Sequence, residues 1–245
     1  TEGAVLVIAG AGSGKTRVLT TRIAYLVLEK QVNPSNIMAI TFTNKAAKEM
    51  KERLALMVGT VNDMWVSTIH SMCVRILRRD IDKIGYDKNF TIYDSDDSKR
   101  VVKDCLNALS LDEKRFPPKQ MLAEISKAKD KLQTPKEYGS EGMGDYYRQS
   151  VYRVYALYQE RLKGANAVDF DDLIVLPIKL FKEHPEVLAR YKERYKYIMV
   201  DEFQDTSHQQ YELMHLLADK NVAVVGDDDQ SIYSWRGADY QNIIN

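Results

Sequence analysis

The sequence predicts an α/β protein that has a parallel sheet and carries an inserted all-α region. Short apolar runs alternate with helical segments near both ends of the chain, which is typical of parallel βαβ units. Between about residues 95 and 195 the apolar residues recur only at helical spacing, and no strand is expected there. The composition, with 44% hydrophobic and 29% charged residues over 245 positions, is that of a globular chain of one or two domains.

The first ninety residues supply three strand–helix pairs of this pattern. An apolar run closed by Gly10 is expected to form a buried parallel strand, and a glycine-rich turn leads from it into a helix. The expected strands cover residues 4–9, 37–42 and 64–69, and the expected helices cover about residues 15–29, 44–56 and 71–79.

The region after about residue 90 changes to helical periodicity. Helices are expected over residues 95–109 and 147–162, and the prolines at 117 and 118 open another, as proline can in a first turn. Asp169 is expected to cap a helix that Pro177 would kink, and Pro185 begins the next one. Because residues 138–145 hold three glycines, a loop is expected there.

The sheet is expected to resume near the end of the chain, with strands over residues 197–200 and 222–225. The strands therefore come from two separated parts of the sequence. We predict one discontinuous α/β domain formed by residues 1–90 and 193–245, and an inserted helical subdomain formed by residues 91–192.

The charge of the chain is balanced overall but uneven along its length. Basic and acidic residues both number 35, so the net charge neither indicates nor excludes a nucleic-acid partner. Residues 1–90 hold 13 basic and 8 acidic residues, whereas residues 201–245 hold 2 and 9. The acidic end is compatible with a solvated surface, and it is equally compatible with a metal or nucleotide site if a motif supports one.

The cysteine count and the length of the apolar runs bear on location. Cys73 and Cys105 are too few for a disulfide framework, so we expect a reducing compartment, the cytoplasm. No apolar run approaches the roughly 20 residues that span a bilayer, and no membrane partner is expected.

A phosphate-binding loop is the first chemical motif. Residues 9–16 read AGAGSGKT, which fits G-x-x-x-x-G-K-[ST] with Ala9 in place of the first glycine. Glycines let consecutive backbone N–H groups approach phosphates, and the helix that follows adds its positive end. Lys15 is expected at the β- and γ-phosphates and Thr16 on Mg²⁺. The loop residues are Ala9, Gly10, Ala11, Gly12, Ser13, Gly14, Lys15 and Thr16.

A second, acidic element follows the predicted strand at 197–200. The apolar run ends in Asp201 and Glu202. Asp201 is expected to hold Mg²⁺, through water, and Glu202 to polarise the attacking water as a general base. Phosphoryl transfer depends mainly on positioning and charge stabilisation, which two such motifs around one Mg²⁺ provide.

Five further segments, in their order along the chain, indicate a family. They read ITFTNKAA at 40–47, STIHS at 67–71, DFDDL at 169–173, VDEFQDT at 200–206 and GDDDQSIYSWRGAD at 226–239. Together with the phosphate-binding loop they resemble the superfamily 1 DNA helicases of the UvrD/Rep/PcrA type, over essentially the whole chain. Residues 70–85 are most similar to the PcrA branch. Ile69 stands where the family usually has phenylalanine, a change that keeps a bulky apolar side chain.

The resemblance implies a fold and residue roles. The fold is a RecA-like P-loop NTPase domain, subdomain 1A, with an inserted helical subdomain 1B. Gln204 and Gln230 would lie near the γ-phosphate and report its presence to the DNA site, which completes a catalytic set with Lys15 and Glu202. Arg17 would lie beside the nucleotide. The implied DNA-binding residues are Phe42, Thr43, Asn44, Thr68, His70, Tyr233, Trp235 and Arg236.

The activity that the resemblance implies is ATP-dependent 3′-to-5′ unwinding of DNA in repair and replication. ATP and Mg²⁺ are the implied cofactors, and aromatic rings that stack on any base suit such a motor. The implied partners are single-stranded DNA, junctions between single and double strands, and RNA polymerase or replication and repair proteins.

Compared with the family, an upstream adenine-reading segment and a second RecA-like domain with its arginines are missing. We therefore expect an N-terminal fragment that has no helicase activity alone, because losing an arginine finger lowers rates on the order of 10³–10⁵-fold in related NTPases. Two alternatives stay open. One is the core of a RecB/AddA-type helicase, which shares these motifs, and the other is a non-catalytic module that docks DNA or a partner protein.

Overall fold

The computed structural model describes residues 2–10, 14–59, 62–141 and 144–227. Backbone contacts divide the chain into two compact units: unit 1 consists of Thr1–Cys73 and Phe181–Asn245, and unit 2 is Val74–Leu180. The divisions fall inside α3 (Ile69–Asp80) and α8 (Asp172–Glu183), earlier in the chain than the predicted boundaries after residues 90 and 192. The sequence analysis assigned residues 1–90 and 193–245 to one subdomain and residues 91–192 to another. That assignment stays a prediction.

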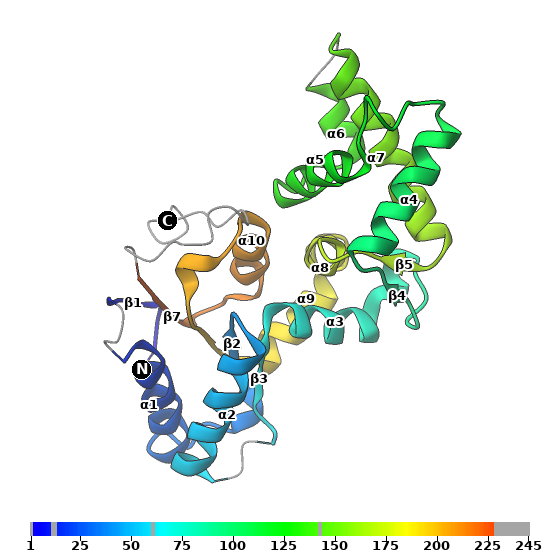
Figure 1. Ribbon diagram of the computed structural model, residues 1–245. Helices are drawn as coiled ribbons and strands as arrows, with labels where there is room; N and C mark the ends of the chain where they lie inside the picture. Colours follow the sequence, from blue (N-terminus) through cyan, green and yellow to red (C-terminus); the bar gives the residue numbers. More distant parts are fainter. Residues whose placement is uncertain (1, 11–13, 60–61, 142–143, 228–245) are drawn as a thin grey trace. The chain divides into compact units, whose positions relative to one another are not determined.

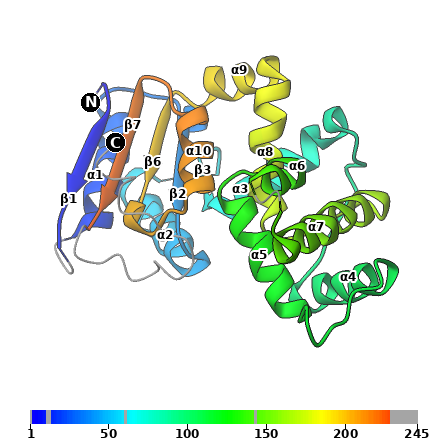
Figure 2. The ribbon, with the colours of Figure 1, turned by 90° about the horizontal axis from the view of Figure 1, so that it is seen from above.

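Unit 1 contains the parallel sheet that the sequence predicts. The strand order is β1-β7-β6-β2-β3, and every pairing is parallel. Figure 2 shows β1, β7, β6 and β2 side by side. Within the described residues, the first and last strands along the chain are therefore neighbours. The strands are β1 (Val5–Ile8), β2 (Ile37–Thr41), β3 (Trp65–Thr68), β6 (Tyr197–Val200) and β7 (Asn221–Gly226).

Helices cover both faces of this sheet (Figure 1). α1 (Lys15–Leu28) and α2 (Asn44–Val58) pack on one face, and α10 (His208–Leu217) lies against the other, where Met214 faces Val222 and Val224. The cluster beneath α1 and α2 consists of Leu19, Ile23, Leu26, Ile37, Ala39, Met50, Leu54, Met64, Val66, Met199, Ala223 and Val225. The remaining elements of unit 1 are α9 (Pro185–Arg194) and the short 3₁₀ helices η1 (Pro34–Asn36) and η3 (Phe203–Asp205).

Local sequence explains where α1 and α2 begin. Gly14 precedes α1 with φ 87°, a left-handed conformation that costs an ordinary residue roughly 1–2 kcal/mol and is open to glycine. α2 begins where the Thr43 side-chain oxygen accepts a hydrogen bond from the Ala46 N–H at 3.1 Å. Such an N-cap stabilises a helix by about 1 kcal/mol.

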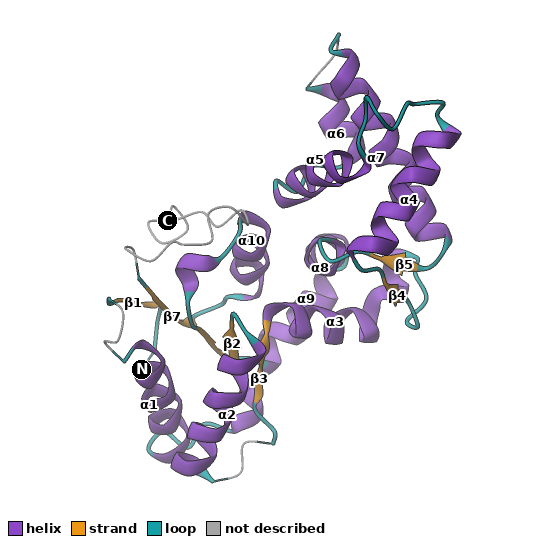
Figure 3. Cartoon of the chain, in the orientation of Figure 1, coloured by secondary structure: helices purple, strands orange, loops and turns teal. Residues whose placement is uncertain are grey.

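Unit 2 is built mainly of helices (Figure 3). α4 (Ser95–Ala108), α5 (Pro118–Asp130) and α7 (Tyr146–Gly164) surround its core, with α6 (Pro135–Ser140) against α7. The other 3₁₀ helix is η2 (Ile81–Ile84). The core cluster consists of Val102, Cys105, Leu106, Leu111, Phe116, Met121, Ile125, Ala128, Tyr138, Val151, Val154, Tyr155, Tyr158, Leu162 and Ala167.

The prediction of an all-α insertion without any strand is wrong in one detail. β4 (Thr91–Ile92) pairs in parallel with β5 (Ala167–Val168), which lies inside the region where no strand was expected. A strand of two residues shows no alternation of polar and apolar side chains, so periodicity cannot reveal it.

The predicted loop over residues 138–145 is also partly wrong, since α6 extends to Ser140. Thr134 and Glu137 form a capping box, and Pro135 occupies the first turn, both of which are helix-start signals. Gly139 serves helix packing, because a Cβ there would lie 2.8 Å from the ring of Tyr152.

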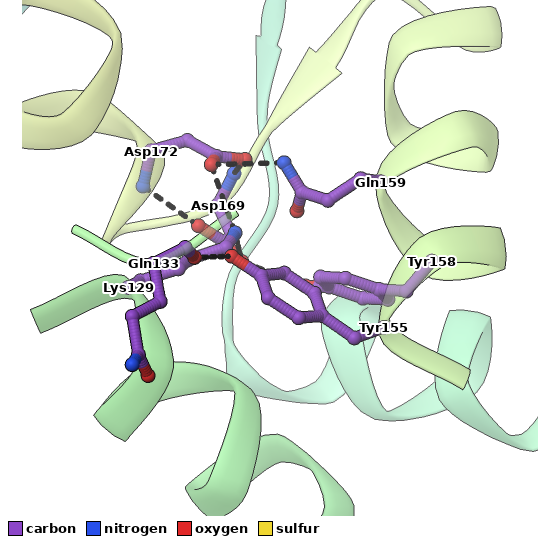
Figure 4. Close-up of polar contacts among 7 residues, drawn as sticks. All are labelled: Lys129, Gln133, Tyr155, Tyr158, Gln159, Asp169 and Asp172. Atoms are coloured by element: carbon purple, nitrogen blue, oxygen red, sulfur yellow. Dashed lines mark hydrogen bonds and ion pairs between the residues drawn. The ribbon is translucent and has the colours of Figure 1, made fainter. Parts of the chain in front are cut away.

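A buried ion triad ties α5 to the start of α8 (Figure 4). Lys129 Nζ lies 2.7 Å from Asp169 Oδ2 and 2.8 Å from Asp172 Oδ1. The Tyr158 hydroxyl also donates to Asp169 at 2.9 Å, and the Asp172 N–H donates to Asp169 Oδ1 at 2.8 Å. Burial opposes the charge of Lys129, but the two carboxylates outweigh it and raise its pKa well above the usual value. The acidic residues of DFDDL that are buried here therefore hold unit 2 together.

The two cysteines lie in the interiors of the units and form no disulfide with each other. Cys73 and Cys105 are free and buried, and burial raises the pKa of the Cys105 thiol to about 11. Burial likewise raises the pKa of Cys73. Within the described residues, no helix combines the length and apolar character required to cross a membrane.

Candidate nucleotide and nucleic-acid site

The motifs of unit 1 meet at one edge of the sheet. The register pairs Ile8 with Gly226, Val200 with Val224, and Thr41 with Thr68, so the carboxyl ends of the strands lie side by side. Ligands of open parallel sheets bind outside these carboxyl ends. The residues that follow the strands are Ala9, Phe42, Ile69, Asp201 and Asp227.

The segment predicted to bind phosphate begins directly after β1 and leads into α1. The Ala9 N–H donates to the Gly226 carbonyl at 3.0 Å, which extends the pairing of β1 and β7. Lys15 is only 8% exposed, and its ammonium group lies 3.2 Å from Asp227 Oδ2 and 3.5 Å from the Gly10 carbonyl oxygen. Arg17 is exposed in the first turn of α1. Ala11, Gly12 and Ser13 lie outside the described residues.

Thr16 and Asp201, the two predicted Mg²⁺ ligands, are in direct contact. The Thr16 hydroxyl donates to Asp201 Oδ2 at 2.7 Å, which joins α1 to the end of β6. Asp201 is buried, and burial raises the pKa of its carboxyl. Its backbone N–H donates to the Ile40 carbonyl at 2.9 Å and so fixes it at the sheet edge.

This pair supplies the oxygen donors that Mg²⁺ prefers, and Mg²⁺ commonly uses one or two protein ligands together with phosphates. Among the described residues no group of three or more His, Cys, Asp and Glu side chains is arranged to hold a metal by itself. The residues present therefore fit a Mg²⁺ that arrives with a nucleotide.

Glu202 and Gln204 form a short polar chain beside this pair. Glu202 has φ 52°, an unfavourable left-handed conformation that is often found at functional sites. The Gln204 side-chain amide donates to Glu202 Oε2, and its carbonyl oxygen accepts from the Asp227 N–H at 3.0 Å. Gln204 is thus buried between the acidic element and the end of β7. Gly226 gives it room, because a Cβ there would lie 3.1 Å from Gln204 Oε1.

Two further acidic residues belong to the site, and the sequence analysis counted them in the acidic end of the chain without giving either a role. Asp227 holds Lys15, and Asp205 is buried with a pKa raised to about 6 by burial and by the charge of Glu202. Both belong to motifs that the sequence analysis quoted, but only the strand order explains why Asp227 faces the loop after β1.

The predicted DNA-binding residues that the structure describes lie at the end of β3 or directly after β2 and β3. Thr43 caps α2, and its carbonyl accepts from the Thr41 hydroxyl at 3.2 Å. Asn44 is the first residue of α2, and Thr68 donates to the Ser71 hydroxyl at 2.9 Å. These contacts place the two segments at the same edge of the sheet.

Phe42 and His70 are half-buried at that edge. Burial lowers the pKa of His70, which favours the neutral imidazole at neutral pH. A neutral ring can hydrogen-bond or stack on a base but adds no charge to a phosphate contact. The other predicted residues, Gln230, Tyr233, Trp235 and Arg236, lie outside the described residues.

Comparisons with known proteins agree with the motifs. The sequence profile of the family described as "UvrD/REP helicase N-terminal domain" matches residues 1–245. Relatives named "ATP-dependent DNA helicase PcrA" from Staphylococcus aureus and Staphylococcus epidermidis are each 56% identical over 248 residues. The alignments cover 100% of this chain and 34% of each relative, so the chain spans about a third of their length. The resemblance found in the motifs is confirmed, and the chain belongs to the UvrD/REP helicase N-terminal domain family.

Proposed function

We propose that this chain is the N-terminal, ATP- and single-stranded-DNA-binding part of an ATP-dependent 3′-to-5′ DNA helicase. The observation that supports it best is the contact of Thr16 with Asp201 at the sheet edge where Lys15 also lies. Three residue types that phosphoryl transfer requires, an ammonium, a hydroxyl and a carboxylate, are thereby placed beside one another.

On the nucleotide side, the loop from Ala9 to Thr16, with Arg17 beside it, would hold the phosphates of ATP. Lys15 would exchange its contact with Asp227 for the β- and γ-phosphates. Thr16 and Asp201 would hold Mg²⁺, which when bound supplies charge stabilisation to the phosphates.

Glu202 is the proposed general base, because its backbone N–H donates to the Asp201 carboxylate and its own carboxylate is held by Gln204. Since Gln204 also binds the backbone of Asp227, it joins the acidic element to the strand that leads toward Gln230. We assign to these two glutamines the role of reporting the γ-phosphate to the DNA site.

On the nucleic-acid side, a single strand would cross the carboxyl ends of β2 and β3. Phe42, Thr43, Asn44, Thr68 and His70 would contact it there, together with Tyr233, Trp235 and Arg236. The physiological substrates in this proposal are junctions between single and double strands in the cytoplasm, in DNA repair and replication. RNA polymerase or replication and repair proteins are the proposed partners of the whole protein.

The test is binding of a fluorescent ATP analogue with Mg²⁺, comparing the unaltered chain with Lys15→Ala. Lys45→Ala is the matched control, since Lys45 is 87% exposed and outside the loop. We expect Lys15→Ala to abolish binding and Lys45→Ala to leave it unchanged. ATP turnover, with and without single-stranded DNA, would be followed in this chain and in one extended through a second RecA-like domain.

Turnover that occurs only in the extended chain and is lost in Lys15→Ala supports a split ATP site of which this chain forms one side. Binding that does not depend on Lys15 in either chain contradicts the proposal, and a non-catalytic docking module would then explain the motifs better.

A further inference from the structure

A cavity in unit 2 has the chemistry of a site for an organic cation. It has a volume of about 180 Å³ and lies between the start of α4, the side chains of α5 and α7, and the turn that leads into α8. Serine hydroxyls and aliphatic side chains complete its lining, and no described residue that lines it is basic. Its aromatic rings and carboxylates belong to Tyr93, Tyr158, Phe170, Asp94, Asp169 and Asp171.

The carboxylates of the lining favour a positive charge in this cavity. Asp169 adds little net charge, because the ammonium group of Lys129 lies 2.7 Å from its Oδ2. Asp94 is exposed, and hydrogen bonds from the backbone N–H groups of Asp97 and Asp96 hold the pKa of its carboxyl below the usual value. Asp94 is therefore ionised at neutral pH, and Asp171 is a further carboxylate of the same lining.

Asp94 can bind a ligand and still cap its helix. The backbone N–H groups of Asp96 and Asp97 both donate to Oδ1 of Asp94, at 2.9 and 2.8 Å. A carboxylate has a second oxygen with its own lone pairs. Oδ2 of Asp94 can thus accept a hydrogen bond from a donor in the cavity while Oδ1 holds the start of α4.

The aromatic side chains favour arginine over lysine as the cation. Phe170 is 58% exposed, although Asp169 beside it in the chain is buried. The planar guanidinium of arginine stacks on aromatic rings and presents five N–H donors, whereas the ammonium of lysine is a compact and strongly hydrated charge. Rings together with carboxylate and hydroxyl acceptors match the guanidinium group.

We propose that this cavity receives an arginine side chain of a partner protein. The guanidinium stacks on Phe170 and donates to the carboxylates of Asp94 and Asp171. The residues of the proposed nucleotide and DNA sites all belong to unit 1, so this inference does not rest on the proposed function. It gives unit 2 a role of its own, which is to dock a protein segment that presents an arginine.

The test is an NMR titration of the whole ¹⁵N-labelled chain with the peptide acetyl-Gly-Gly-Arg-Gly-Gly-amide. We expect saturable shifts of the backbone N–H signals of residues 94–98 and 169–171. The same peptide with citrulline has the shape of arginine without its charge. It should bind about tenfold more weakly, because charge-assisted hydrogen bonds are roughly twice as strong as neutral ones.

Two variants test the roles of the carboxylate and the ring. Asp94→Asn removes the charge and keeps the N-cap, since asparagine caps helices as well as aspartate does, and its affinity for the arginine peptide should fall about fivefold. Its matched control is Asp145→Asn at the exposed N-cap of α7, where Asp145 Oδ1 accepts from Tyr147 and Arg148 in the same way. Phe170→Leu keeps an apolar side chain without the ring, and it should weaken binding about threefold.

The outcomes are distinguishable, because the same spectra show whether each variant is folded. No saturable shift in the unaltered chain overturns the proposal, and so do equal affinities of Asp94→Asn and Asp145→Asn or of the arginine and citrulline peptides. Agmatine, a free small molecule with the same guanidinium, separates the two sources of the cation. If it binds at these residues roughly tenfold more tightly than the peptide, the cavity serves a free cation and the protein partner is overturned.

Discussion

The ammonium group of Lys15 lies 3.2 Å from Oδ2 of Asp227, and both side chains are buried. The two residues are 212 positions apart, and they meet because β7 lies next to β1. A buried ammonium needs a counter-charge. Asp227 provides it, and in the proposed function a phosphate would compete with this carboxylate for Lys15.

Asp227→Asn should therefore destabilise unit 1 and increase the stabilisation that a nucleotide provides. Removing one partner of a buried ion pair costs about 3 kcal/mol. Thermal melting with and without Mg²⁺ and ATP measures both effects. Asp219→Asn, at an exposed position just before β7, is the control. An equal nucleotide-induced shift in the parent and in Asp227→Asn would show that Asp227 does not compete with phosphate.

Lys129→Met should destabilise unit 2 far more than the substitution of a solvent-exposed lysine in the same unit. The substitution leaves Asp169 and Asp172 buried without their shared cation, at a cost of about 3–5 kcal/mol. Limited proteolysis of residues 74–180 reports this loss. The triple variant Lys129→Met/Asp169→Asn/Asp172→Asn should recover much of it, because no buried charge remains. If the triple variant is as unstable as Lys129→Met, the ion pairs are not the cause.

Asp205→Asn should change how stability depends on pH. The pKa of Asp205 is raised from 3.8 to about 6, first by burial and then by Glu202, with Lys15 opposing. Between pH 3.8 and about 6, the folded chain therefore keeps the proton of the Asp205 carboxyl, whereas the unfolded chain releases it. The contribution of Asp205 to the free energy of unfolding thus falls as the pH rises through about 6. The variant should melt higher than the parent above about pH 7, by roughly 2–4 °C for each kcal/mol recovered. The difference should shrink toward about pH 4, and a constant difference across this range would contradict the assignment.

Gly226→Ala should destabilise the folded chain, and the cost should come mainly from the contact of the new Cβ with Gln204. The new Cβ would lie 3.1 Å from Gln204 Oε1, so the amide that holds the Asp227 N–H must shift. We expect a loss of about 1–3 kcal/mol from this overpacking. In a Gln204→Ala background the same substitution should cost clearly less, and urea unfolding of the four chains measures the coupling. Equal costs in both backgrounds would assign the effect to the backbone of Gly226.

The positions of strands and helices could be predicted where apolar runs end in glycine or aspartate. The run of β1 that is closed by Gly10 and the run of β6 that ends at Asp201 are such cases. The order of the strands could not be predicted, since periodicity along one strand carries no information about its neighbours. For this reason the pairing of Lys15 with Asp227 emerges only from the structure.

The sequence analysis assigned Thr16 and Asp201 to the same Mg²⁺ without predicting that their side chains are hydrogen-bonded to each other, as they are in the structure. The triad of Lys129 with Asp169 and Asp172 was not predicted, although DFDDL was recognised, because a lysine on a helix usually faces solvent.

The strand order also has a consequence for how the chain folds as it is synthesised. In the described part of the sheet, β1 pairs only with β7, so β1 meets its partner only after about two hundred further residues have been made. Unit 2, whose residues lie between them, can complete its own core in the meantime, as domains generally fold as units. Until β6 and β7 emerge, the backbone edge of β1 and the apolar faces of α1 and α2 lack their cover, and this is the interval in which the nascent chain is most exposed to aggregation.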